Sequence, residues 1–380
     1  MPSVFFYISG HGFGHVSREI EVINTLAAAC PGLSIVVRTA AARRLFDRTA
    51  RPPLTFIDGA CDTGVVQVDS LRLDEDATVR CAAEFHRQLP RLALEEAALL
   101  REHDARFVVA DVAPLAPLAA SHAGVPSAVL ANFTWDWIYE GYPEALRAAP
   151  DLIAIIRDAY RHAGEAWRLP VHGGFAMFDS PIDVPFIARH ATRDPLDVRR
   201  LLQLPADVPL ALSSFGGYGL RNFDLRRLDC LDEWGIVITG NEPPGALPAG
   251  VHYIDEGRMY ASGVGYEDLI ATVDVVVTKP GFGIVTECLA NDTAMLYSSR
   301  GHFPEYDVIV EEMPKYVRNA FISHDDLFAG KWETHLDKLL AQPKVKKKPE
   351  TNGADVAADL LLKALDKPPK KPRGRPKAKF

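Results

Sequence analysis

Two histidines beside a glycine-rich turn are the first residues of the chain that can do chemistry. His11 and His15 belong to Gly-His-Gly-Phe-Gly-His at 10–15, directly after an apolar run at 4–9. An apolar run followed by glycines indicates a strand that turns into a helix. A histidine there can act as a general base near neutral pH, because the positive helix end favours its neutral form. We expect His15 to be that base, although its side chain can instead cap or pack the helix.

Two further polar residues of this half can join His15. Asp111 ends another strand-like run, where an acid costs free energy unless it is paired or used. It can orient a histidine, bind an acceptor hydroxyl or itself act as the base, or it can cap the helix expected from Pro114. Arg18 lies one turn beyond His15 and can bind an anion or pair with a neighbouring acid.

A mixed aromatic and polar segment, Asn-Phe-Thr-Trp-Asp-Trp at 132–137, follows the apolar run at 127–131. Aromatic rings beside amide and carboxylate groups suit a sugar, although the two tryptophans can instead anchor the next helix in the core. We therefore expect an acceptor side formed by His11, Gly12, Gly14, Arg18, Asn132, Trp135 and Asp136, with His15 and Asp111 as catalytic residues.

The second half contains Val-Val-Val-Thr-Lys-Pro-Gly-Phe-Gly-Ile-Val-Thr-Glu at 275–287. This pattern predicts a strand, a tight turn and a helix N-terminus. Backbone N–H groups at such a turn are free of helical partners and lie at the positive end of the dipole, where phosphate binds well. Glu287 lies about one turn further and can accept hydrogen bonds from a ribose. The alternative is an ordinary strand–helix turn with a surface acid.

A second glycine turn, Ser-Phe-Gly-Gly-Tyr-Gly at 214–219, follows another apolar run and can hold a diphosphate through N–H and hydroxyl groups. Glu305, after the next strand, can accept hydrogen bonds from a sugar or serve as a first-turn helix acid. We expect a nucleotide sugar to be bound by Ser214, Gly216, Gly217, Lys279, Gly281, Gly283, Glu287 and Glu305.

The elements that must position these residues alternate between strand-like and helical stretches. Strands are expected at 4–9, 34–38, 54–58, 107–111, 127–131, 210–214, 235–239, 251–254, 275–278 and 294–298. Helices are expected between them, with long ones at 77–102 and 143–167, whereas 61–74 has no clear period and reads as a loop near the site. Such alternation predicts an α/β fold with parallel sheets, whose ligands bind at the carboxyl ends of the strands.

A stretch rich in proline and glycine divides the alternation into two units. We predict a Rossmann-like acceptor domain at 1–168, an interdomain linker at 169–190, a Rossmann-like nucleotide-sugar domain at 191–342, a basic segment with a closing helix at 343–366 and a disordered basic tail at 367–380. The two domains are expected to face each other across a cleft.

The composition of the 380 residues limits the function classes. A net charge of −8 gives no general attraction to nucleic acid. Five scattered cysteines without CxxC spacing argue against a disulfide framework or a structural zinc site, and we expect no metal and no cofactor. The N-terminus resembles a strand rather than a signal peptide, and no apolar run approaches the length of a membrane span. We expect a cytoplasmic protein that can act at a membrane surface.

The tail is the one part of the chain with a different chemistry. It carries seven Lys or Arg residues, no acid, and the tetrapeptide Arg-Gly-Arg-Pro at 373–376. Arginines in this pattern can enter the minor groove of A·T-rich DNA. Weak DNA contact through 367–380 is therefore one interpretation, and a solvated basic tail is the other.

The motifs taken together resemble the GT-B glycosyltransferases, in the branch of the peptidoglycan N-acetylglucosaminyltransferase and the diacylglycerol galactosyltransferases. Gly-His-Gly-Phe-Gly-His-Val-Ser-Arg, Asn-Phe-Thr-Trp-Asp-Trp-Ile-Tyr, Ser-Phe-Gly-Gly-Tyr-Gly and Gly-Phe-Gly-Ile-Val-Thr-Glu-Cys-Leu-Ala resemble more closely the glycosyltransferase-like N-terminal region of plant arabinose kinases. The resemblance runs from about Val4 to Leu365 and excludes the tail.

The resemblance implies roles for single residues. Gly14 and His15 would lie on the acceptor side with His15 as base, and Glu287 would hold the ribose. Gly216 and Gly217 would contact the diphosphate, and Glu305 would meet the donor sugar. The sequence departs from many relatives at Tyr306, where they have glutamine after the acid. The donor sugar therefore does not follow from the motif.

The resulting expectation is an inverting, metal-independent glycosyltransferase that uses a nucleotide-diphosphate sugar of the UDP series. The acceptor hydroxyl would belong to a lipid-linked or small molecule. Arabinose kinase activity is not expected, because the sugar-kinase domain of the plant proteins does not follow in this sequence. Two alternatives remain open, a nucleotide-sugar 2-epimerase of the same fold and a non-catalytic nucleotide-sugar-binding or regulatory protein with a DNA-binding tail.

Overall fold

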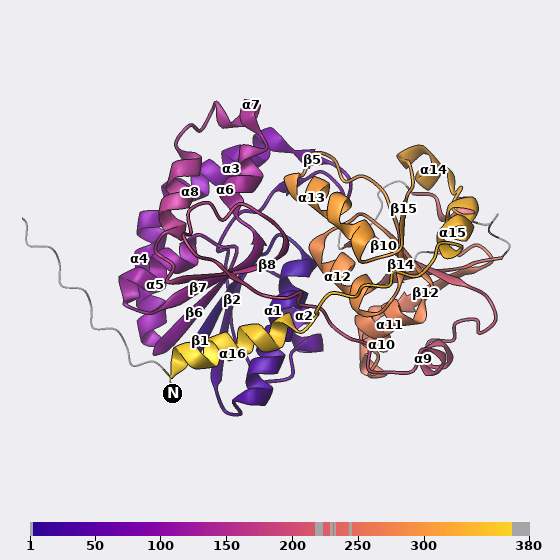
Figure 1. The fold of residues 1–380 in the computed structure, drawn as a ribbon, viewed down its shortest axis with the longest axis horizontal. Coiled ribbons are helices and arrows are strands. Elements are labelled where there is room, and N and C mark those ends of the chain that lie inside the picture. Colours follow the sequence, from indigo (N-terminus) through magenta and orange to yellow (C-terminus); the bar gives the residue numbers. More distant parts are fainter. Residues whose placement is uncertain (1–2, 217–222, 229–230, 232, 243–244, 367–380) are drawn as a thin grey trace, which may run out of the picture.

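The computed structural model describes residues 3–216, 223–228, 231, 233–242 and 245–366 (Figure 1). Gly217 of the predicted diphosphate turn and the basic tail 367–380 lie outside the described residues.

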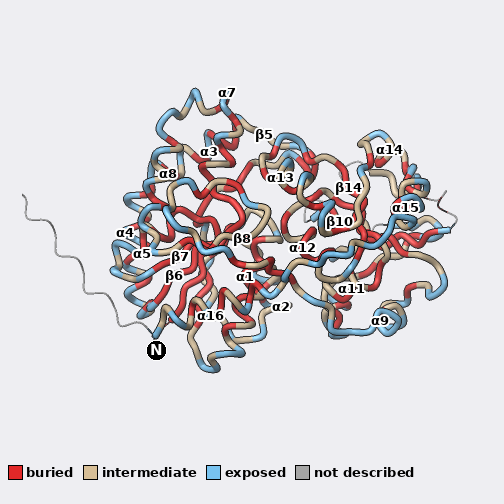
Figure 2. Tube along the Cα trace, viewed as in Figure 1, coloured by how far each residue is buried: buried red, intermediate tan, exposed pale blue. Residues whose placement is uncertain are grey.

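The first half of the chain forms a parallel sheet of seven strands, within the described residues, in the order β3-β2-β1-β6-β7-β8-β9. These strands are β1 Ser3–Ile8, β2 Ser34–Thr39, β3 Thr55–Asp58, β6 Ala105–Asp111, β7 Ser127–Phe133, β8 Glu165–Gly173 and β9 Ile182–Asp183. Every residue of β1 and of β7 is buried, because helices cover both faces of the sheet (Figure 2). Burial on both faces explains why these strands are continuous apolar runs rather than alternating ones.

The second half forms a parallel sheet whose six described strands have the order β12-β11-β10-β13-β14-β15. They are β10 Leu210–Ser214, β11 Gly235–Gly240, β12 Val251–Asp255, β13 Val275–Thr278, β14 Ala294–Tyr297 and β15 Asn319–Phe321. The predicted α/β class with two Rossmann-like units is therefore confirmed. In both units the strand order reverses at the central strand: β1 lies between β2 and β6, and β10 lies between β11 and β13. Such a reversal places a crevice at the carboxyl end of the central strand.

Helices cover the two sheets on both faces (Figure 1). They are α1 Phe13–Ala29, α2 Arg43–Thr49, α3 Glu75–Arg87, α4 Leu89–Glu102, α5 Leu115–Ala123, α6 Trp135–Glu140, α7 Pro143–Leu146, α8 Leu152–Tyr160, α9 Pro195–Leu201, α10 Glu256–Ala261, α11 Tyr266–Thr272, α12 Phe282–Ala290, α13 Pro304–Glu312, α14 His324–Ala329, α15 Glu333–Leu340 and α16 Gly353–Leu365, with short 3₁₀ turns at Leu225–Leu228 and Met313–Lys315. None of the helices in the described part of the chain has both the length and the apolar character needed to cross a bilayer.

Three sequence predictions of secondary structure need correction. The single helix predicted at 143–167 is instead two helices, α7 and α8, separated by residues 147–151, and the second ends at Tyr160. The predicted linker 169–190 begins inside the first sheet, because β8 extends to Gly173 and β9 also lies within it. Pro170 is tolerated in β8 because the outer neighbour β9 pairs only with Trp167 and Arg168. The loop predicted at 61–74 contains a small antiparallel pair, β4 Val66–Gln67 and β5 Leu73–Asp74.

The last helix returns to the first sheet. α16 packs against α1 and β6, and Figure 1 shows it, in yellow, beneath the first sheet. The N–H of Gly353 donates to the carbonyl of Phe186 at 2.9 Å, and a Cβ at Gly353 would lie 2.1 Å from the carbonyl oxygen of Pro185. Glycine at this position therefore permits the close crossing of two backbones.

Candidate active site

The N-termini of two helices, one from each half of the chain, meet at a pair of glycines. Gly14 in α1 and Gly283 in α12 are so close that a Cβ on Gly283 would lie 2.8 Å from the Cα of Gly14. Neither helix has a side-chain cap or an acidic residue in its first turn. Both positive helix ends, with their uncapped N–H groups, therefore lie at the same junction, which favours a negatively charged group.

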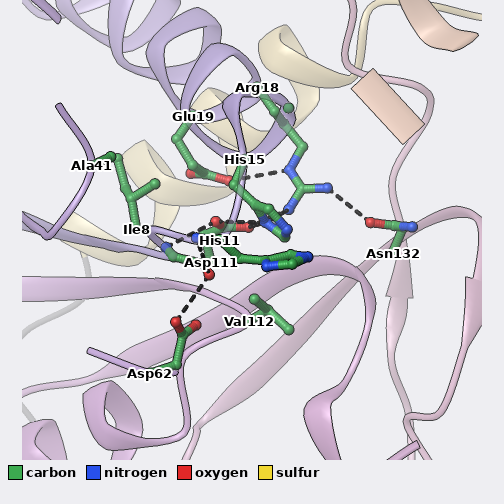
Figure 3. A network of polar contacts seen from close by, with 12 residues as sticks. Ile8, His11, His15, Arg18, Glu19, Ala41, Asp62, Asp111, Val112 and Asn132 are labelled. Atoms are coloured by element: carbon green, nitrogen blue, oxygen red, sulfur yellow. Dashed lines mark hydrogen bonds and ion pairs between the residues drawn. The ribbon is translucent and has the colours of Figure 1, made fainter. Parts of the chain in front are cut away.

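A histidine, an aspartate and an arginine form the centre of this junction (Figure 3). His15, on the first turn of α1, places Nδ1 3.0 Å from Oδ2 of Asp111 at the end of β6. Arg18, one turn later, donates to Oδ1 of the same carboxylate. Burial alone raises the pKa of Asp111, but His15 and Arg18 outweigh burial and the net pKa is lowered. The carboxylate is therefore ionised and holds the ring of His15.

The hydrogen bonds of the two histidines distinguish their roles. Because Nδ1 of His15 donates to Asp111, its Nε2 carries the free lone pair that a base requires. The N–H of Val65 donates to Nδ1 of His11 at 3.4 Å, so that Nε2 of neutral His11 carries the proton. Burial, followed by the charges of His15 and Arg300, lowers the pKa of His11 well below its usual range. The arrangement favours His15 over His11 as base.

A second carboxylate, which the sequence did not single out, lies behind the histidines. Asp62 accepts from the hydroxyl of Ser9 at 3.0 Å and from the indole N–H of Trp135 at 2.9 Å. The N–H of Ser9 also donates to Asp111 at 3.2 Å, so that Ser9 links the two acids. Burial raises the pKa of Asp62 to about 6, although both hydrogen bonds oppose the shift. Its irregular surroundings at 61–74 gave no sequence signal for this position.

A hydrogen-bonded chain crosses from the first half of the molecule to the second. Arg18 donates to Oδ1 of Asn132 at 3.0 Å, and Nδ2 of Asn132 donates to Oε1 of Glu305 at 2.8 Å. Arg300, which the sequence also did not indicate, donates to Oε2 of Glu305 at 3.3 Å. The predicted donor-sugar acid is thus connected to the predicted base through three contacts, from Glu305 to Asn132, from Asn132 to Arg18 and from Arg18 to His15.

Lys279 supplies a cation on the second side of the junction. Burial, followed by repulsion from Arg300, lowers its pKa to about 7. Ser214, at the end of the neighbouring strand, bonds through its hydroxyl to the hydroxyl of Tyr266 at 2.7 Å. Gly216 has φ +71°, the left-handed conformation that favours glycine in such a turn. Gly281 is the N-cap residue of α12, as Gly12 is of α1.

Glu287, the predicted ribose ligand, is paired in the structure. Arg189, from the segment that joins the two halves, donates through Nε to Oε1 of Glu287 at 2.7 Å and also lies 3.2 Å from Glu267. Burial raises the pKa of Glu287, although the charge of Arg189 opposes this. A ligand hydroxyl at Glu287 would therefore share the carboxylate with Arg189 or displace it.

Two residues predicted on the acceptor side are fully buried. Trp135 is fully buried and stacks on Tyr139, so its ring does not offer a face to a sugar. Asp136 is also fully buried and pairs with Nε of Arg157 at 2.7 Å, which joins α6 to α8. Both residues serve the core behind the site. Among the described residues, no three or more His, Cys, Asp or Glu side chains gather to hold a metal ion.

Comparison with solved structures defines the fold. The calicheamicin glycosyltransferase CalG4 matches with a TM-score of 0.63 at 17% identity, covering 96% of this chain and 98% of CalG4. UGT89C1 of Arabidopsis thaliana, solved with UDP, matches with a TM-score of 0.61 at 13% identity, covering 96% of this chain and 100% of that one. The glycosyltransferase VinC, solved with DTDP, matches with a TM-score of 0.55 at 15% identity, covering 96% and 95%. The chain therefore has the GT-B fold that its motifs predicted.

Within that fold, the sequence is similar to a plant protein. It is 29% identical over 360 residues to L-arabinokinase of Arabidopsis thaliana, a match that covers 94% of this chain and 34% of that protein. The chain thus spans about a third of the length of this relative. No protein-family model matches the chain.

Proposed function

We propose that the chain is an inverting glycosyltransferase that moves a sugar from a UDP-linked donor to an acceptor hydroxyl without a required metal ion. The observation that carries this proposal is the His15–Asp111 pair, 3.0 Å apart, at a helix end that contacts the N-terminus of α12. The fold supports the class of reaction, and the solved neighbour with bound UDP supports the donor series.

His15 would act on the acceptor. Its Nε2 takes the proton of the acceptor hydroxyl, while ionised Asp111 stabilises the imidazolium that forms. The acceptor oxygen attacks the anomeric carbon, and the bond from that carbon to the diphosphate oxygen breaks. This single displacement inverts the anomeric centre. Glu305 would hold hydroxyls of the donor sugar, because its carboxylate already connects to the base through Asn132 and Arg18.

The second domain would stabilise the leaving diphosphate. Negative charge grows on its oxygen as the bond breaks, and preorganised donors lower the barrier most at such a position. The N-terminus of α12, the turn at Gly216 and the Lys279 ammonium group all lie at the carboxyl ends of the second sheet. Arg300 adds a buried cation to this side. Together these groups would take the part that a metal ion plays elsewhere.

Substitution of His15 tests the base directly. His15→Ala should lower transfer by at least about 100-fold because the proton acceptor is lost, while UDP binding by calorimetry should change little. His11→Gln should lower transfer by a smaller factor, since Nε2 of His11 carries a proton and cannot accept one from the acceptor. Full turnover by His15→Ala, or an equal loss in His11→Gln, would overturn the assignment.

A thermal-shift screen of nucleotide-diphosphate sugars tests the donor class. UDP-linked sugars should raise the melting temperature in a saturable way, and Glu287→Ala should weaken the effect because a ribose ligand is lost. Glu267→Ala is the matched control, since it removes the other partner of Arg189 without removing the proposed ribose ligand. Equal weakening by both variants would assign the effect to Arg189. Conversion of a donor to its epimer without acceptor would replace the transferase proposal by the epimerase.

A further inference from the structure

The segment 61–75, here called the strap, belongs to the first half of the chain but touches both halves. It leaves the first sheet after β3, forms the β4–β5 pair and leads into α3. Figure 1 shows β5 above the junction, beside α13 of the second half. Because its contacts join the histidine turn of the first half to turns of the second half, the strap calls for a role of its own.

The first part of the strap is fastened to the histidine turn. Its Asp62 accepts from Ser9, and Val65 donates to His11. Gly64 has φ +61°, and a Cβ there would lie 2.7 Å from Nδ1 of His11. The hydroxyl of Tyr139 donates to the carbonyl of Gly64 at 2.9 Å and fixes the strap from the other side. The position of His11 is therefore tied to that of residues 62–65.

The second part of the strap is fastened to the second half. The hydroxyl of Ser70 donates to the carbonyl of Phe215 at 2.9 Å, one residue before Gly216. Leu71 is 5% exposed and packs in an apolar cluster with Phe215 under the second sheet. A Cβ on Gly301 would lie 3.1 Å from the carbonyl of Leu71, so the backbones also touch there. The strap thus contacts the turn before Gly216 and the turn that carries Arg300.

We propose that Ser70 and Leu71 are positioning residues that hold the Phe215–Gly216 turn for the donor diphosphate and so couple donor binding to the placement of the His11 turn. This inference rests on the function proposed above and adds a contribution of the acceptor domain to the donor site. A coupling of this kind is reciprocal, so bound donor must also stabilise the strap. Donor would then order the acceptor side before transfer.

Variants of the strap test the positioning role. Ser70→Ala should raise the donor KM and the Kd for UDP by about fivefold, because hydrogen bonding by its hydroxyl is lost, with a much smaller change in kcat. Ser70→Thr should restore both values because it keeps the hydroxyl. Leu71→Ala should weaken UDP binding in the same way. Val68→Thr is the control, because Val68 is an exposed residue of the strap and threonine has nearly the same shape as valine.

Hydrogen exchange supplies a readout that does not depend on activity. In wild-type protein, UDP should slow exchange of amides in 61–75 as well as near Gly216, and Ser70→Ala should remove the protection of the strap. Normal UDP binding by Ser70→Ala and Leu71→Ala, or protection confined to the second half, would overturn the inference alone. Failure of wild-type protein to bind any nucleoside diphosphate would instead overturn the proposed function, and the inference with it.

Discussion

The surroundings of Lys279 favour the neutral form of its side chain. Its pKa is lowered to about 7, first by burial and then by Arg300, so the ammonium form is lost as the pH rises through neutrality. A diphosphate binds the protonated form better. Affinity for UDP-glucose should therefore fall by up to about tenfold between about pH 6 and about pH 8.5, given one lost charge contact. Calorimetry across this range measures the effect, and the diphosphate of UDP-glucose does not itself titrate there.

Two substitutions separate Lys279 from other titrating groups. Lys279→Arg keeps a permanent charge and should make binding nearly independent of pH. Lys279→Gln should bind weakly throughout the range, also without a slope. Persistence of the wild-type slope in Lys279→Gln would assign the pH dependence to another group, such as Asp62, whose pKa is about 6.

At the residue level, the sequence predicted the groups that end strands or open helices. His15 and Asp111 could be placed because a glycine turn and a buried strand end are local patterns. The pairing of Asn132 with Glu305 could not, since 173 residues separate them and only the meeting of two domains brings them together. Arg189 and Arg300 were missed for a related reason. An arginine in a loop has no periodic pattern, and the acid that pairs with Arg189 lies 98 residues away.

At the scale of elements, the contact between α1 and α12 makes a prediction about two glycines. A Cβ at Gly283 would lie 2.8 Å from the Cα of Gly14, a backbone atom that cannot rotate away. Gly283→Ala should therefore push the helices apart and cost about 1–3 kcal/mol. Thermal unfolding should show a lower midpoint, and stabilisation by UDP should shrink because the junction is displaced.

Gly14→Ala is the matched control, because it adds the same methyl group to the other side of the contact. Its Cβ would lie 3.4 Å from the nitrogen of Gly283, which leaves room after a small adjustment. Alanine is also the better helix former by about 1 kcal/mol, so stability should stay the same or rise slightly. If Gly14→Ala lowered the unfolding midpoint as much as Gly283→Ala does, the loss in Gly283→Ala could not be assigned to the contact of its Cβ with the Cα of Gly14.

The alternation of elements was the most predictable part of the fold. Strands buried on both faces, such as β1, β7 and β13, are continuous apolar runs that sequence patterns identify easily. β8 was missed because Glu165, Arg168 and Pro170 interrupt its apolar pattern. Its polar side chains are possible because the strand lies near the edge of the sheet, where β9 covers it only partly. Edge position is a property of the whole sheet and not of the local sequence.

At the scale of the whole molecule, the halves are held together by more than the junction. One apolar cluster contains residues of both sheets, of the connecting segment at Phe186 and Ile187, and of α16. At the far end of the interface, Arg48 of α2 lies 3.0 Å from Glu256 of α10. The chain therefore crosses between the halves at the connecting segment and again before α16. Two crossings restrict relative motion more than one linker would.

α16 should therefore determine the stability of the molecule without affecting donor affinity. Leu361 is fully buried where α16 packs on the first domain, and Leu361→Ala should cost about 2–4 kcal/mol by leaving a cavity. Lys363→Ala, on the exposed side of the same helix, should cost little. Both variants should keep the wild-type Kd for UDP, because both residues lie more than two helical turns from Gly353, where α16 meets the connecting segment. Thermal unfolding with and without UDP measures both quantities. An unchanged midpoint in Leu361→Ala would mean that the returning helix rests on the first domain without stabilising it, and a changed Kd would mean that its packing reaches the junction through α1.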